Sequence, residues 1–143
     1  MKKILLLAIL LIVVGVVEVV SGIDQTASVN VTSNLSMTLS PSSLTFGQIT
    51  AGNSKDVTST FTGSTSNLQI SQITVTQTSG SVLTNSNVKF SKNGGTTFDT
   101  SANIVPISIP AQSSVNVIVR LTVPSGTQSG SSQGTITYTI LEA

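Results

Sequence analysis

The side chains that could carry out acid–base or metal chemistry are few and far apart in the sequence. The chain has no Cys and no His, which excludes thiolate and imidazole metal sites, a Cys nucleophile and a Ser-His-Asp triad. After residue 22 the carboxylates are those of Asp24, Asp56, Asp99 and Glu142. This spacing lacks the dense acidic pattern of a calcium loop, and it argues for no acid–base pair. We therefore predict a protein that is not an enzyme and that has no catalytic residue, metal site or cofactor.

The composition is that of a neutral chain rich in hydroxyl groups. Of 143 residues, 24 are Ser and 21 are Thr, whereas charged residues make up 8% and aromatic residues 3%. After residue 22 the acidic side chains are balanced by four basic ones, Lys55, Lys89, Lys92 and Arg120. This balance provides no basic surface for binding the backbone of a nucleic acid. A neutral surface also gives weak colloidal repulsion, which favours self-association.

Residues 1–22 form a separate segment. A positive lead at residues 1–3 is followed by an apolar run at residues 4–17, and Ser21 and Gly22 are small. This order is typical of a secretory signal peptide, here with cleavage before Ile23. Two alternatives stay open, an uncleaved membrane anchor and a helix kept in a filament core. In each case we expect the rest of the chain to be exported to the cell surface, with membrane contact limited to residues 1–22.

From residue 23 onward the apolar residues follow the two-residue period of β-strands, and no stripe of period 3.6 is present. The alternation is strictest at residues 115–123 and 136–140. Turns rich in Gly, Pro, Ser and Asn separate the strands. Eight or nine short strands of this kind predict an all-β sandwich. It is formed by residues 23–143 as one domain, preceded by the hydrophobic N-terminal helix or signal segment.

Two irregularities in the alternation predict local features. Ile70 and Ile73 are out of phase by one residue, so we expect a β-bulge near residues 71–72 that keeps both side chains on the core face. Pro106 interrupts the Ile-rich run at residues 104–109. Because proline cannot donate a ladder hydrogen bond, this run is predicted to be an edge strand.

The alternation of side chains between the two faces of a strand predicts whether the remaining large residues point to the core or to solvent. Arg120 lies between two inward-facing apolar residues and is expected to point to solvent. The aromatic side chains are spread over the strands and are expected to pack in the core. They are Phe46, Phe61, Phe90, Phe98 and Tyr138.

Three stretches resemble the Ig-like β-sandwich modules of archaeal and bacterial extracellular surface proteins. Residues 44–54 are similar to their L-x-F-G-x-I-x-x-G-x-S opening, residues 67–73 to a following strand pair, and residues 123–137 to a closing V-P-x-G-x-x-x-G-x-x-x-G-x-I hairpin. The resemblance covers residues 36–141 and implies an Ig-like antiparallel β-sandwich of about eight strands. The usual aromatic residue before the final Gly is absent. Such modules include adhesins, fibre subunits, spacers and sugar-binding modules, so the fold does not determine the function.

Residues 91–98, with the sequence S-K-N-G-G-T-T-F, are similar to the Asp-box turn S-x-D-x-G-x-T-W. Asn93 replaces the Asp, and Phe98 replaces the Trp. An Asn-Gly step tolerates positive φ, and the Ser91 and Thr97 side chains can bind the backbone of the turn. We therefore predict a tight structural turn and not a ligand site.

Two N-glycosylation sequons follow one another near the start of the domain. Their acceptors are Asn30 and Asn34. Both fall on the opposite parity from the apolar residues Val29, Val31 and Leu35, so glycans there would project away from the core. We predict these two residues as glycosylation candidates, whose use depends on the secretion route.

The segment at residues 23–39 suggests a route of assembly. Its alternating apolar residues are predicted assembly anchors, namely Val29, Val31, Leu35, Met37 and Leu39. Such a segment can pair as the first strand of its own sheet, or it can complete the sheet of a neighbouring copy. The second mode resembles donor-strand assembly in archaeal bundling pili and camelysin-type biofilm fibres.

The first functional hypothesis is therefore a structural subunit of a cell-surface filament or coat, with further copies of the chain as its partners. The alternative is a secreted adhesion module that binds a glycan or a protein partner. That alternative requires exposed aromatic residues or a clustered polar cleft.

Overall fold

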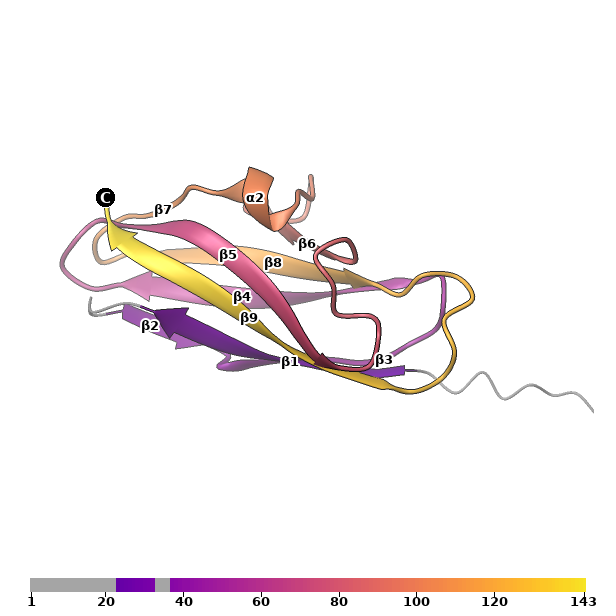
Figure 1. Cartoon of the computed structure of the whole chain (residues 1–143). Coiled ribbons are helices and arrows are strands. Elements are labelled where there is room, and N and C mark those ends of the chain that lie inside the picture. Colours follow the sequence, from indigo (N-terminus) through magenta and orange to yellow (C-terminus); the bar gives the residue numbers. More distant parts are fainter. Residues whose placement is uncertain (1–22, 33–36) are drawn as a thin grey trace, which may run out of the picture.

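The computed structural model describes residues 23–32 and 37–143, which fold into two facing β-sheets (Figure 1). The first sheet has the strand order β3-β1-β9-β5-β7, and the second has the order β2-β4-β8-β6. The strands of the first sheet are β1 (Ile23–Thr32), β3 (Ser43–Ile49), β5 (Leu68–Ser79), β7 (Ile107–Ile109) and β9 (Ser131–Glu142). Those of the second are β2 (Met37–Ser40), β4 (Ser54–Gly63), β6 (Val88–Ser91) and β8 (Ser114–Thr122). The short helix α2 (Ser101–Ile104) follows β6. The predicted all-β sandwich is confirmed.

Successive strands alternate between the two sheets, so each described connection crosses from one sheet to the other. Crossings of this kind are typical of double-sheet jelly rolls. In the immunoglobulin arrangement consecutive strands such as A and B share one sheet. The strand order therefore differs from the Ig-like order that the resemblance of residues 36–141 implies.

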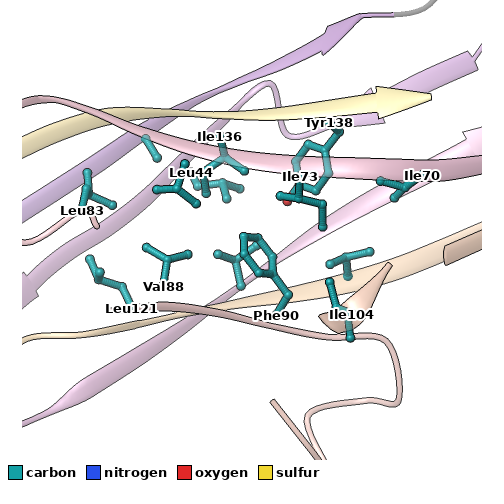
Figure 2. Packing of buried hydrophobic residues seen from close by; sticks show 14 of the residues in the cluster. Leu44, Ile70, Ile73, Leu83, Val88, Phe90, Ile104, Leu121, Ile136 and Tyr138 are labelled. Atoms are coloured by element: carbon teal, nitrogen blue, oxygen red, sulfur yellow. The ribbon is translucent and has the colours of Figure 1, made fainter. Parts of the chain in front are cut away.

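The core lies between the two sheets and is built from alternate residues of the strands. On β9, Ile136 and Tyr138 are fully buried, whereas the Thr residues beside them are partly exposed. Figure 2 shows these two side chains facing Phe90 and Val88 of the other sheet. The Tyr138 ring also meets Phe61 edge-on, with 4.8 Å between ring centroids. Edge-to-face pairs add stability beyond area burial, so the buried aromatics fix the spacing of the sheets.

Both predicted irregularities are present. The register between β5 and β9 shifts between Ile70 and Gln72, and Ile70 and Ile73 both face the core. β7 lies at the edge of the first sheet, directly after Pro106. Ile104, which we placed on the same strand, is instead the buried last residue of α2.

The predicted alternating segment at residues 29–39 is divided between two strands. Val29 belongs to β1 in the first sheet, whereas Met37 and Leu39 belong to β2 in the second. The chain changes sheets between these strands, so the segment does not present one continuous apolar face. Residues 1–22 and 33–36 lie outside the described residues. Within the described ranges, no helix has the length and apolar character needed to cross a membrane.

Candidate functional site

The position of β1 distinguishes it from the other strands. It is antiparallel to β3 on one side and parallel to β9 on the other (Figure 1). The ladder with β9 runs from Asp24 opposite Ser131 to Thr32 opposite Thr139. The strand nearest the N-terminus therefore fills a slot beside the last strand of the chain. We call the space between β3 and β9 the β1 slot.

Three inward side chains of β1 are described, those of Gln25, Ala27 and Val29. Gln25 and Ala27 are buried, and Val29 packs against the margin of the core. The flanking strands supply much larger groups, such as Phe46 on β3 and Ile136 on β9. Main-chain ladders hold β1 on both of its edges.

The strand β9 packs tightly against β5 at the level of Ala27. Ala27 is the register partner of Gly134 on β9. A Cβ atom on Gly134 would lie 2.7 Å from the Thr76 carbonyl oxygen and 3.4 Å from the Leu83 Cβ. Contacts this close to a backbone atom are excluded by sterics. At this level β9 therefore requires a glycine beside β5.

The outward face of β1 is neutral and rich in hydroxyl groups. Ser28 Oγ lies 3.0 Å from Thr135 Oγ1 on β9. A shallow depression of about 390 Å³ covers this face and is lined by residues of β3, β1, β9 and β5, including Thr45 and Gln133. Its lining carries no charged or aromatic side chain. It therefore offers no ring on which a sugar could stack.

The structure places three of the five predicted anchors against the core. Val29, Met37 and Leu39 are partly buried there. Val31 lies in β1 opposite Tyr138, but its side chain and all of Leu35 fall outside the described residues.

The predicted glycosylation candidates are only partly covered. Asn30 is the register partner of Thr137 on β9, and its side chain lies outside the described part of the structure. Asn34 lies outside it altogether.

Gln25 is a buried residue of the slot that the sequence analysis missed. It has the same parity as Val29 and Val31, and this was the signal that could have placed it inward.

The predicted tight turn at residues 91–98 is present. The buried Ser91 Oγ donates to Asn93 Oδ1 at 2.7 Å and accepts the Gly95 N–H at 3.0 Å. Asn93 Oδ1 also accepts the Thr97 N–H at 3.1 Å. Gly94 and Gly95 both have positive φ, which only glycine adopts without strain. The side chains of the motif are thus used within the turn itself.

Arg120 points outward as predicted, and it organises the surface next to this turn. Its Nε and Nη2 donate to the two Asp56 carboxylate oxygens at 2.7 and 2.8 Å. Its guanidinium lies 3.7 Å from the centroid of the Phe98 ring. The hydrogen bonds that it donates to the Asp56 carboxylate raise the pKa of Arg120 above its ordinary value. The prediction that Phe98 packs in the core is wrong, because this ring is partly exposed and packs against Arg120.

Replacing Arg120 by Ala is expected to destabilise the domain by about 1 kcal/mol. The exposed ion pair contributes roughly 0.2–1 kcal/mol, and the cation–π contact contributes roughly 0.5–1 kcal/mol. Arg120→Lys keeps the charge but loses the bidentate geometry, so its unfolding midpoint in urea should fall between those of the parent and Arg120→Ala. Equal unfolding midpoints for all three chains would show that the contacts of Arg120 with Asp56 and Phe98 do not stabilise the domain.

The structure does not gather the acidic residues into a site. Asp56 is paired with Arg120, and the backbone of Asp99 bridges to Phe90. Within residues 23–32 and 37–143, no three His, Cys, Asp or Glu side chains lie close enough to hold a metal ion. No protein-family model matches the chain, and no curated protein sequence is similar to it. The candidate functional site is therefore the β1 slot, which is distinguished by its geometry.

Proposed function

We propose that this chain is a non-enzymatic structural subunit of an extracellular filament, and that it assembles by placing β1 in the β1 slot of a neighbouring copy. The observation that supports this proposal is the position of β1 between β3 and β9. The remaining strands, β2 to β9, already alternate between the sheets and cover one core. Within the first sheet, β1 joins β3 to the other strands.

Exchange of β1 between copies would conserve its interactions. The strand is held by backbone ladders on both edges, and a β1 from a neighbouring subunit would form the same ladders. An empty slot would leave two rows of unpaired backbone groups, which is the situation that drives strand addition. Because donor and slot are different surfaces, each added subunit presents a new slot, and a filament results when the contact does not close into a ring.

The surface chemistry is compatible with self-assembly outside the cell. The basic and acidic residues after residue 22 are equal in number, so copies of the domain repel one another only weakly. The face around β1 carries hydroxyl and amide groups, whose hydrogen bonds are insensitive to salt screening. The segment preceding β1, residues 1–22, is the proposed export signal, with an uncleaved membrane anchor or a helix kept in the filament core as the alternatives.

Disulfide trapping in mixed filaments tests the exchange directly, because the chain has no cysteine of its own. One chain carries Ser28→Cys and a second carries Thr135→Cys, at positions whose hydroxyl oxygens are 3.0 Å apart. Oxidation of fibres grown from the mixture is expected to give dimers that join the two chains.

The matched control replaces the first chain by one with Thr38→Cys, which lies on β2 in the opposite sheet. It should give no dimer. Fibres that form from the Ser28→Cys and Thr135→Cys chains but yield no disulfide-linked dimer would show that β1 stays in its own chain. Electron micrographs of native material without fibres would refute the filament itself.

A further inference from the structure

Two buried polar side chains are neighbours at the start of β1. The buried polar residues of the described chain are Gln25, Ser59, Ser91 and Ser132. Gln25 on β1 and Ser132 on β9 are register partners, with exposed fractions of 0% and 2%. The inward positions that follow, Ala27 on β1 and Ile136 on β9, are apolar. The polar pair is therefore confined to one level of the slot.

Burial of the Gln25 amide at this position is energetically unfavourable. Neither its Oε1 nor its Nε2 has a hydrogen-bond partner among the described residues. Burying an unpaired amide is unfavourable, so stability alone would favour an apolar side chain at this position.

Ser132 offers Gln25 a complementary group. Its Oγ accepts the backbone N–H groups of Ser81 and Val82, at 3.0 and 3.1 Å. This use of its lone pairs leaves the hydroxyl hydrogen for donation, and an amide Oε1 can only accept. The two side chains of this register pair are therefore complementary in donor and acceptor type, but no hydrogen bond joins them in the described structure.

The other edge of β1 is also irregular at this level. Gln25 lies opposite Gly47 of β3, which has a φ of 63°, and the β1–β3 register shifts between Gln25 and Thr26. A β-bulge pins the alignment of the strands that it joins. The register shift beside Gly47 on β3 and the buried Ser132 hydroxyl on β9 therefore both lie at the level of Gln25.

We propose that Gln25 determines the register in which β1 occupies the slot. A slide of β1 by two residues keeps its inward face, so the side-chain period alone does not exclude it. Such a slide would carry Gln25 to the level of Ala27, opposite Gly134 of β9 and Leu44 of β3, and neither of these residues has a side-chain hydrogen-bonding group for the amide. A single buried polar residue that specifies register at a cost in stability is well attested in coiled coils.

This inference refines the proposed assembly, and it applies equally to a β1 from the same chain or from a neighbouring one. In a filament it would align each donor strand with its slot.

Paired cysteines in the full chain report the register. Ser28→Cys with Thr135→Cys matches the observed alignment, and Ser28→Cys with Thr137→Cys matches β1 moved forward by two residues. In the parent background only the matched pair should form a disulfide. In a Gln25→Ala background the yield of the shifted pair should rise from background to near that of the matched pair, because an alanine fits at either level.

The control is Thr26→Ala, on the exposed face of β1, which should leave only the matched disulfide. A Gln25→Ala chain that still cross-links only in the matched register would overturn the proposal. Should that variant fail to fold, Gln25→Val, with its higher β-propensity, takes its place under the same criterion. Disulfides within one chain and between chains differ in product mass, so the origin of β1 is read separately from its register.

Discussion

A chain that begins at Met37 is expected to lose its cooperative thermal unfolding, and to regain it when a peptide of residues 23–32 is added. Removing β1 leaves β3 and β9 with unpaired edges in the middle of the first sheet and opens the core at Ala27. Ladder hydrogen bonds contribute about 0.5–1.5 kcal/mol each in net terms, so their loss exceeds the effect of an ordinary point substitution. The measurement is a circular dichroism melt of the shortened chain with increasing peptide.

Peptides with single substitutions provide the controls. Ala27→Asp in the peptide places a charge at a position that is 1% exposed, so this peptide should not restore the melt. Ser28→Asp places the same charge on the exposed face and should restore it. Equal rescue by both peptides would mean that β1 does not enter the slot, and a shortened chain that melts like the full one would mean that β1 is dispensable for the fold.

Tyr138→Ala is expected to destabilise the domain by about 3–5 kcal/mol, which is the usual cost of truncating a fully buried aromatic residue. The ring lies between Phe61 and Phe90, with centroid distances of 4.8 and 6.4 Å. Its hydroxyl has no hydrogen-bond partner of good geometry among the described residues. Tyr138→Phe should therefore keep or raise the melting temperature at neutral pH, because it removes only a buried unpaired group.

The same residue should control alkaline unfolding. Burial raises the pKa of Tyr138 well above its ordinary 10.0, and the nearby Ser59 hydroxyl offsets this only in part. The unfolded chain then loses the phenolic proton near pH 10 while the folded chain keeps it. The contribution of Tyr138 to the free energy of unfolding is therefore fully present below that pH. Above it, the free energy of unfolding falls by up to about 1.4 kcal/mol per pH unit.

Tyrosinate absorbance measures this transition cleanly, because Tyr138 is the single Tyr and the chain has no Trp. Ionisation should coincide with loss of the β-sheet circular dichroism signal. The Tyr138→Phe chain should stay folded to a higher pH than the parent. A phenol that ionises near pH 10 in a chain that is still folded would contradict its burial.

Features that depend on a few neighbouring residues could be predicted from the sequence. The phase slip between Ile70 and Ile73 located a bulge, and Pro106 located an edge strand, since proline has no N–H to give to a ladder. The Asn-Gly step at residues 93–94 located a tight turn. Each of these follows from backbone chemistry within one segment, so no knowledge of distant residues was needed.

The pairing of strands depended on contacts that no local pattern contains. A period of two shows that one side of a strand is buried, but it does not identify the neighbouring strand or the sheet. The parallel pairing of β1 with β9, and the division of residues 29–39 between two sheets, therefore emerged only in the tertiary structure.

The same limit applies to single side chains. By itself the sequence determined that the chain after residue 22 is made mainly of strands and that its acidic and basic residues there are balanced, and it located the edge strand after Pro106 and the turn at residues 91–98. Only the tertiary structure decided that Phe98 leaves the core for Arg120, and that Gln25 is buried beside Ser132. The physical reason is that burial is a property of the packed neighbours, and for Gln25 those neighbours come from a strand at the other end of the described chain.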